Sequence, residues 1–319
     1  MISVLMSVYN EKPIYLEKAI KSILNQTYKD IEFIIVLDSP DNNILLNIIQ
    51  QFSKSDNRIR ILINEENIGL ALSLNKAIHA SNGQYLARMD SDDISKPERL
   101  ERELKFLTEN NFDVIGCVAD KIDEEDNVWG VIAPIENDQK LIRTLLPKQN
   151  IIIHPTVLMK ADVIKSLNGY RNFPSCQDYD LWLRLLSGNY RIGILNENLF
   201  QFRRHRKSIT ATKRFGQILN EIYIRKLYDE RCTKGSDSYT ETNLHEFLER
   251  NGFYDHIISN RENKRLNQYN KGIRMIKSKQ LGGVIKVTQA LCSKSVRSCV
   301  KTSILTRKIK GKYRKGKLV

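Results

Sequence analysis

The chain has 319 residues, of which 41% are hydrophobic and 28% charged, and its formal net charge at pH 7 is +14. This apolar content is sufficient for a folded core, and because no run of 18 apolar residues occurs we expect no transmembrane helix. The five scattered cysteines form no C-x-x-C pair, which argues against a zinc site or a disulfide framework. The N-terminus has no basic stretch of the kind that opens a signal peptide, so we expect a protein of the reducing cytoplasm.

The positive charge is concentrated at the C-terminus. Residues 263–319 contain 17 lysines and arginines and no acidic residue, whereas residues 1–262 contain 34 basic and 37 acidic residues. Such a segment binds anionic surfaces, either lipid or nucleic acid. Because Tyr313 is the one aromatic residue of its last stretch, stacking platforms for bases are scarce and we expect no nucleic acid.

The first hundred residues alternate between two hydrophobic patterns, apolar runs and helical spacing. The expected strands are residues 2–8, 31–37, 59–63 and 84–90, and the expected helices are residues 16–24, 44–52 and 70–80. This order predicts a mostly parallel sheet with right-handed crossovers, flanked by helices. Neither a G-x-G-x-x-G motif nor a P-loop motif occurs, so a diphosphate would need a metal or basic side chains.

The second half is less regular. We expect helices at 100–107 and 179–186, strands at 114–118 and 129–132, and a bent or edge strand at 151–158, where Pro155 interrupts an apolar run. Residues 211–262 have a helical pattern, and a weakly amphipathic basic helix follows after about residue 280.

Polar residues follow three of the predicted parallel strands: Ser7–Glu11, Asp38–Ser39 and Asp90–Asp93. Ligands of parallel sheets bind beyond the carboxyl ends of the strands. On an extended backbone Asp90 and Asp92 point the same way, and their oxygen atoms suit a divalent cation held against a diphosphate. The alternative is an acidic loop before a helix, since Ser95 and Glu98 form the pattern of a capping box.

These motifs together resemble the family 2 glycosyltransferases, which have the GT-A fold. The resemblance covers about residues 1–210 and includes His154–Thr156, Gln177–Trp182 and Phe202–His205. The subgroup looks like bacterial enzymes that build O-antigen, capsule or exopolysaccharide repeat units. The resemblance implies a transferase domain at 1–210 (nucleotide half 1–110, acceptor half 111–210). The helical pattern and the positive charge of the remaining residues predict a helical extension at 211–280 and a basic membrane-associating tail at 281–319.

The resemblance also implies a UDP-sugar donor, Mn²⁺ or Mg²⁺, and inversion at the anomeric carbon to form a β-linkage. The implied nucleotide-sugar ligands are Ser7, Tyr9, Glu11, Asp38, Asn67, Arg88, Asp90 and Arg203. The implied metal ligands are Asp92, Asp90 and His205, and whether Asp90 binds ribose or metal is left open.

The general base implied by the resemblance is Asp178, which would deprotonate the acceptor hydroxyl. Gln177 stands where the family usually has glutamate, so an amide would replace that carboxylate. The alternative is that Asp178 only caps the following helix. For His154, a structural role and a contact with the acceptor are both left open. Trp129 and Trp182 belong either to the core or to the surface that faces the acceptor.

The expected acceptor is a lipid-diphosphate-linked saccharide, such as an undecaprenyl-diphosphate glycan, at the inner face of the cell membrane. Two other classes of protein remain as alternatives. A nucleotidyltransferase shares paired carboxylates on a similar sheet, but Tyr9–Lys12 lacks the glycine-rich loop that such enzymes usually carry. A nucleic-acid-binding protein could use the basic tail.

Overall fold

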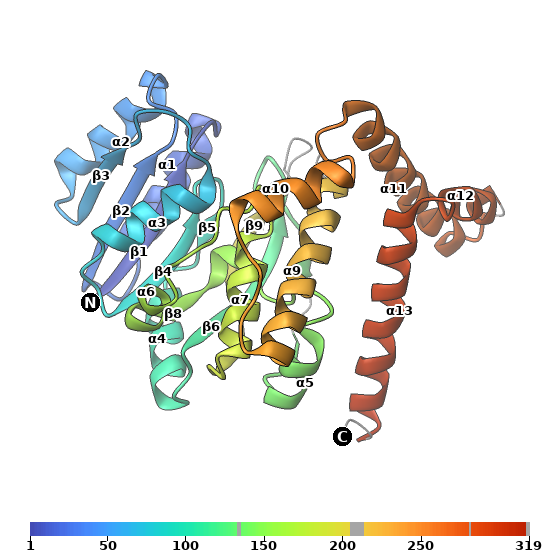
Figure 1. Cartoon of the computed structure of the whole chain (residues 1–319). Coiled ribbons are helices and arrows are strands. Elements are labelled where there is room, and N and C mark those ends of the chain that lie inside the picture. Colours follow the sequence, from blue (N-terminus) through green and yellow to red (C-terminus); the bar gives the residue numbers. More distant parts are fainter. Residues whose placement is uncertain (133–134, 205–213, 281, 317–319) are drawn as a thin grey trace. The chain divides into compact units, whose positions relative to one another are not determined.

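The computed structural model describes residues 1–132, 135–204, 214–280 and 282–316, and it divides into two compact units (Figure 1). The first unit contains residues 1–142, 151–172 and 180–205. The second contains residues 143–150, 173–179 and 206–319. Residues 211–280 and 281–319, expected as separate segments, thus belong to one unit.

Four parallel strands form the N-terminal half of the sheet in the first unit, in the order β3-β2-β1-β4. These strands are β1 (Ile2–Val8), β2 (Ile31–Leu37), β3 (Ile59–Ile63) and β4 (Tyr85–Asp90), and the crossover helices are α1 (Pro13–Leu24), α2 (Asn43–Ser55) and α3 (Leu70–Ala80). Strand β2 is buried along its whole length, as the continuous apolar run requires. The predicted strand–helix alternation is confirmed.

The sheet continues with mixed strand directions. Strand β8 (Leu158–Lys160) runs antiparallel to β4 and to β6 (Val114–Ile122), so β4 and β6 are parallel to each other. Beyond β6 lie β9 (Ile192–Arg203) and the short β5 (Ile94–Ser95), while β7 (Val128–Ile132) pairs with β6 as a hairpin. The remaining elements are α4 (Arg99–Glu109), α5 (Gln139–Leu145), η1 (His154–Thr156), α6 (Ala161–Ser166) and α7 (Gln177–Ser187).

Two local expectations were wrong. Ser95 does not cap α4: it lies buried in β5, where its hydroxyl accepts a hydrogen bond from Gln26 Nε2 at 3.1 Å, and the N-cap position is Glu98. The expected strand at 151–158 is instead the 3-10 turn η1 followed by β8. In both places a tertiary contact or a proline overrode the local pattern.

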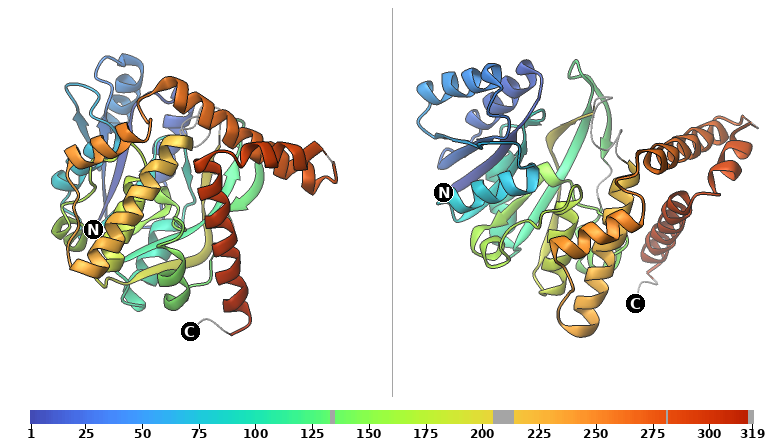
Figure 2. Two further views of the ribbon diagram at one scale, coloured as in Figure 1. Left: turned by 45° about the vertical axis from the view of Figure 1, so that its right-hand side comes forward. Right: turned by 45° about the horizontal axis from the view of Figure 1, so that its top comes forward.

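The second unit contains the C-terminal helices (Figure 2). They are α9 (Arg214–Lys234), α10 (Glu241–Arg250), α11 (His256–Lys277), α12 (Gly282–Ala290) and α13 (Lys294–Arg314). Helix α13 is packed into this unit, because Val296 is fully buried and Ser295 Oγ donates to the buried Glu262 carboxylate at 3.0 Å. Among the described helices, none is both long and apolar enough to cross a bilayer.

Candidate active site

Three carboxylates gather where β4 ends. Asp90 is the last residue of β4, a turn at Ser91 and Asp92 follows, and Asp93 precedes β5. One ligand oxygen from each of the three aspartates lies within 4.8 Å of the others. The clustering therefore comes from a turn, and the explanation from an extended backbone was wrong. Asp93 joins the cluster as a member that the D-x-D spacing did not single out.

The cluster is electrostatically strained. Desolvation and the negative charge of Asp92 raise the pKa of Asp93 well above its ordinary value. Desolvation also raises the pKa of Asp90, although the positive charge of Arg88 opposes the shift. Asp93 Oδ2 is buried and accepts no hydrogen bond from the described residues. Crowded acidic oxygens of this kind are stabilised when a cation binds between them.

Buried arginines support the cluster from within the fold. Arg88 is 2% exposed and forms an ion pair with Asp90. Arg99, which is fully buried, donates from Nη2 to the Arg88 carbonyl oxygen at 3.0 Å and pairs with the equally buried Glu103 at 3.2 Å. Arg99 thereby fixes the strand two residues before Asp90. The local sequence around Arg99 did not indicate its contact with the Arg88 carbonyl oxygen.

The loop after β1 lies beside the same turn. Ser7 is in register with Asp90 across the β1–β4 pair, and Glu11 accepts a hydrogen bond from the Tyr9 backbone N–H at 2.9 Å. Desolvation and the charge of Asp92 raise the pKa of Glu11, while a hydrogen bond with Ser91 opposes the shift. The structure therefore brings Ser7 and Glu11 to the carboxylate cluster.

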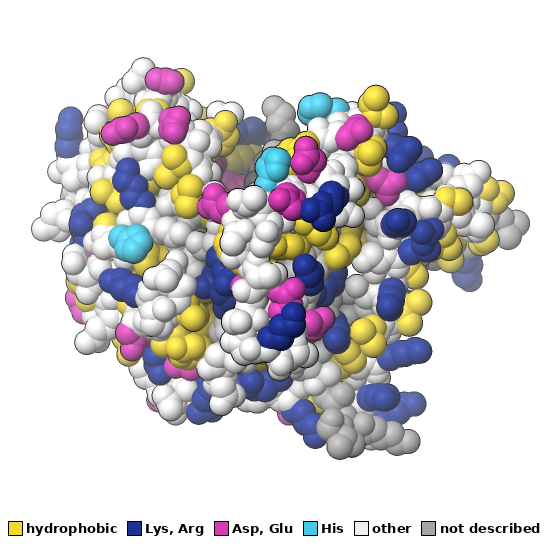
Figure 3. Space-filling model, in the orientation of Figure 1, with side chains coloured by type: hydrophobic (Ala, Val, Ile, Leu, Met, Phe, Trp, Pro, Cys, Tyr) yellow, Lys and Arg dark blue, Asp and Glu magenta, His cyan; other side chains and the backbone are white. Residues whose placement is uncertain are grey.

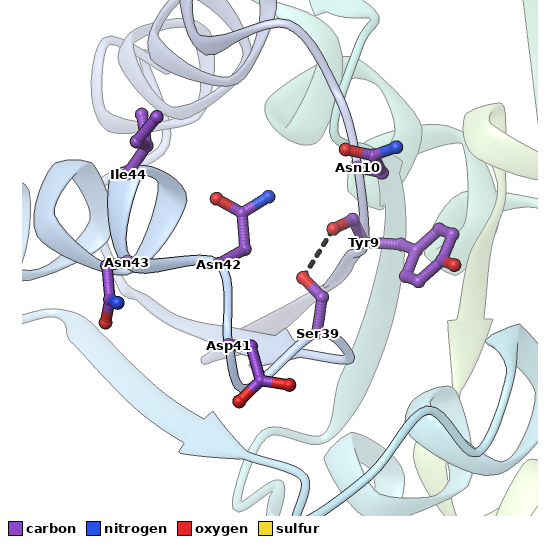
Figure 4. A pocket seen from close by; sticks show the side chains of 7 residues that line it. All are labelled: Tyr9, Asn10, Ser39, Asp41, Asn42, Asn43 and Ile44. Carbon is purple, nitrogen blue, oxygen red and sulfur yellow. Dashed lines mark hydrogen bonds between the residues drawn. The ribbon is translucent and has the colours of Figure 1, made fainter.

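An open hollow of about 520 Å³ adjoins this loop (Figure 4). It lies between the β1 loop and the start of α2, and its lining residues are Tyr9, Asn10, Ser39, Asp41, Asn42, Asn43 and Ile44. Ser39 Oγ donates to the Tyr9 carbonyl oxygen, which ties the two loops together. Tyr9 itself is 52% exposed. The segment 41–44 was not predicted, although it directly follows a strand end.

Asp38 is buried and holds a neighbouring loop. Its carboxylate accepts hydrogen bonds from the backbone N–H groups of Ile68 and Gly69, both at 2.9 Å, and from Asn64 Nδ2 at 2.7 Å. Gly69 has φ +84°, which favours glycine at the start of α3. Asn67 is exposed on the loop that Asp38 fixes. A nucleotide contact by Asp38 or Asn67 stays a prediction.

Arg203 connects the cluster to the β6–β7 turn. Its Nε donates to the Asp92 carbonyl oxygen and its Nη1 to the Asp123 carbonyl oxygen, each at 2.7 Å. Its Nη2 pairs with Asp126 at 2.5 Å, and its guanidinium lies 4.2 Å from the centre of the Tyr15 ring. Its backbone N–H also donates to Asp93. These contacts position the carboxylate turn; a direct contact with a diphosphate stays a prediction. His205 lies outside the described residues.

His154 packs against two aromatic rings in the first unit. Its Nε2 lies 2.9 Å from the Tyr170 hydroxyl, and Tyr170 and Trp182 both meet its ring edge-on. Desolvation and the charge of Arg88 hold the pKa of His154 well below its ordinary value, so the ring is neutral at pH 7. Trp182 is fully buried, whereas Trp129 is 57% exposed beneath the Lys121 ammonium.

Asp178 belongs to the second unit, in the first turn of α7. Its Oδ2 accepts a hydrogen bond from Asn150 Nδ2 at 2.7 Å. The helix begins at Gln177, two residues earlier than a cap at Asp178 would require. A carboxylate in this first turn is favoured by the helix dipole. Asp178 is half-buried, and its role as general base stays a prediction.

The carboxylate cluster fits a hard divalent cation. Asp90, Asp92 and Asp93 supply oxygen atoms, the donor type that Mg²⁺ and Mn²⁺ prefer, and the buried Oδ2 of Asp93 is an acceptor in need of a partner. With the hollow beside it, this arrangement has the parts needed to bind a nucleoside diphosphate derivative.

Comparisons with known proteins agree with this architecture. The structure of S. aureus TarS 1-349 in complex with UDP-GlcNAc has a TM-score of 0.60 at 16% identity, and the match covers 99% of this chain and 92% of that chain. The mannosyltransferase PcManGT from Pyrobaculum calidifontis, solved with GDP-Man and Mn²⁺, has a TM-score of 0.57 at 14% identity and covers 98% and 86%. The fold is therefore the GT-A fold.

Sequence comparison identifies the family. The sequence profile of glycosyl transferase family 2 matches residues 3–167, more than half of the chain. The O-antigen biosynthesis glycosyltransferase WbnJ of Escherichia coli is 37% identical over 211 residues, which cover 65% of this chain and 81% of that protein. The chain belongs to glycosyl transferase family 2. The resemblance and fold predicted from the sequence are confirmed, and the nucleotidyltransferase alternative is set aside.

Proposed function

We propose that the chain transfers a hexose or N-acetylhexosamine from a UDP-sugar to a lipid-diphosphate-linked glycan during synthesis of a bacterial surface polysaccharide. The observation that carries this proposal is the cluster of Asp90, Asp92 and Asp93 beside the hollow at the β1 loop. A sugar nucleotide has a diphosphate that needs a cation and a planar base that needs an open recess. Both features lie at the carboxyl ends of parallel strands.

In this proposal the hollow, with Tyr9 at its rim, holds the nucleobase end of the donor. Asp90, Asp92 and Asp93 hold Mn²⁺ or Mg²⁺, which when bound neutralises negative charge on the departing diphosphate. Arg203 keeps the turn of these carboxylates in place through the Asp92 carbonyl oxygen. PcManGT, solved with Mn²⁺, supports a metal in this fold.

Asp178 is the proposed general base. It takes the proton from an acceptor hydroxyl, whose oxygen forms the new bond to the anomeric carbon of the sugar. The bond between that carbon and the β-phosphate oxygen of UDP breaks, and UDP leaves with the bonding electrons. Attack from the opposite face inverts the anomeric centre, so an α-linked donor gives a β-linked product.

The polysaccharide assignment rests on the named relatives. WbnJ is described as an O-antigen enzyme, and the amylovoran enzyme AmsE of Erwinia amylovora is 28% identical over 230 residues. Polysaccharide units of this kind grow on lipid carriers, so we propose action at the inner face of the cell membrane. The acid-free segment 263–319 supports this location because it favours an anionic surface.

A donor screen tests the proposal directly. The full-length protein is incubated with a panel of UDP-sugars and a lipid-diphosphate GlcNAc or GalNAc acceptor, with Mn²⁺ or with a chelator, and released UDP and glycolipid product are measured. We expect transfer from one donor and none after chelation. Asp92→Asn and Asp178→Asn should each lower turnover by about a hundredfold or more, Asp178→Asn with donor binding nearly intact.

Matched controls separate these effects from a general loss of charge. Asp162→Asn, on α6, and Asp229→Asn, on α9, remove an exposed carboxylate from the first and second unit respectively and should keep full turnover. Full activity of Asp178→Asn would place the base elsewhere. Undiminished transfer in chelator would contradict the role of the carboxylate cluster.

A further inference from the structure

Helices α11 and α12 form a tightly packed hairpin in the second unit. A Cβ atom added to Gly272 would lie 2.8 Å from the Gly283 carbonyl oxygen, and one added to Gly283 would lie 2.7 Å from the Gly272 carbonyl oxygen. The two backbones therefore touch where only glycine fits. Gln268 Nε2 donates to Gln289 Oε1 at 2.7 Å further along the hairpin. This packing fixes the direction in which the outer side chains of α12 point.

The hairpin exposes large apolar side chains at its end. Val284 is 55% exposed, Ile285 62% and Ile276 42%. Ile276 lies at the start of α12, because its side chain is 2.9 Å from the Cβ position of Gly283, the residue that precedes Val284 and Ile285. We call Ile276, Val284 and Ile285 the apolar tip. Three solvent-exposed aliphatic side chains at one end of a rigid element indicate an interaction surface for another molecule or a membrane.

Positive charge surrounds the apolar tip. Arg274, Lys277 and Lys279 are exposed beside it on α11 and its end, and Lys286 follows it on α12. No acidic residue occurs between 263 and 319 that could neutralise them. Figure 3 shows dark-blue basic side chains mixed with yellow apolar ones along α11, α12 and α13.

We propose that the apolar tip of the α11–α12 hairpin inserts into the headgroup region of an anionic lipid bilayer. The aliphatic side chains suit the acyl chains of a bilayer, and the surrounding lysines and arginine suit its anionic headgroups. A second copy of the chain fits less well, because two such tips would bring positive charges together. Nucleic acid supplies negative charge but no aliphatic phase for Val284 and Ile285.

This inference differs from a disordered basic tail that binds by charge alone. It assigns membrane contact to a folded element, and it does not depend on the transferase reaction. Helix α13 is anchored next to the hairpin through the buried Glu262, which pairs with Arg265 at 3.1 Å and accepts a hydrogen bond from Ser295. Deletion of α12 and α13 would uncover buried residues, so point variants are the appropriate test.

The test measures binding of the full-length protein to vesicles by flotation. Phosphatidylcholine vesicles are compared with vesicles that also contain phosphatidylglycerol, and the variant Ile285→Asp is compared with Ile257→Asp. Ile257 is 80% exposed at the other end of α11, so both variants make the same change in an exposed isoleucine of one unit. We expect wild-type binding only to the anionic vesicles. Ile285→Asp should reduce it by about tenfold or more, and Ile257→Asp by less than about threefold.

A second variant keeps the test decisive if Ile285→Asp is poorly folded. Ile285→Trp should strengthen vesicle binding, since tryptophan favours the membrane interface. The proposal is overturned by equal losses in the two aspartate variants, by no binding of the wild type to anionic vesicles, or by tighter binding to RNA than to these vesicles. It is also overturned if Ile285→Asp changes the oligomeric state and leaves vesicle binding unchanged. UDP release from the donor should be the same in all variants, so failure here is distinguishable from failure of the proposed reaction.

Discussion

Replacement of Arg203 by methionine separates a positioning role from a direct contact with the donor. The guanidinium is buried and makes two hydrogen bonds at 2.7 Å and an ion pair at 2.5 Å. Loss of one partner of a buried pair costs about 3–5 kcal/mol, and we expect the lower end because Asp126 is 27% exposed and also pairs with Lys18. For a folding unit of about 150–250 residues, the size range of the first unit, about 3 kcal/mol corresponds to a fall in Tm of roughly 6–12 °C.

The substitution should also weaken Mn²⁺ binding by about 10–100-fold, because Arg203 orients the turn that carries Asp92. Unfolding is followed by thermal melting, and Mn²⁺ and UDP binding by calorimetry. Arg102→Met is the matched control: its ion pair with Glu197 is exposed, so it should change stability by no more than about 1 kcal/mol. Unchanged stability and Mn²⁺ affinity, with weaker UDP binding alone, would refute the positioning role and favour a direct phosphate contact.

Two further predictions concern buried charge. The raised pKa values of Asp90 and Asp93 mean that folding takes up protons. The stability contributed by these groups is therefore complete at low pH and is lost as pH rises through the raised values. Mn²⁺ requires the ionised forms, so calorimetry should show its affinity rising with pH by up to about tenfold per unit, and a flat profile would contradict this. For the buried pair, Glu103→Gln alone should cost about 3–5 kcal/mol in urea unfolding, whereas Arg99→Met combined with Glu103→Leu should recover most of it; equal losses would refute this reasoning.

The strands and helices of the N-terminal half of the sheet could be predicted from the local sequence pattern. Strands β1, β2 and β3 and helix α3 have the predicted bounds because each is an apolar run or a clear helical repeat ended by a polar or turn residue. Parallel strands buried on both faces must be continuously apolar, so their pattern does not depend on distant partners. The same regularity predicted that Ser7 and Asp90 lie at one edge of the sheet.

Contacts between residues that are distant in the sequence could not be predicted from the sequence. The spacing of Asp90 and Asp92 indicated an extended segment, but a turn places them together with Asp93. Asp38 was predicted as a ligand from its place after a strand, and the sequence did not indicate that both its oxygens hold the loop at 64–69. Arg203 lies in a basic run that suggested a solvated or phosphate-binding surface, and its partners are more than 70 residues away.

The sequence by itself was sufficient to predict the parallel sheet, the family and the basic C-terminal region. The signals were hydrophobic periodicity, polar residues at strand ends, and the absence of acidic residues after residue 262. Each of those features depends only on residues that are close together in the sequence. The tertiary structure alone decided which carboxylates cluster at the end of β4, which arginines make internal ion pairs and hydrogen bonds, and that the basic region is a folded set of helices with an apolar tip. Burial and charge pairing depend on what a side chain meets across the fold, and no local pattern specifies that.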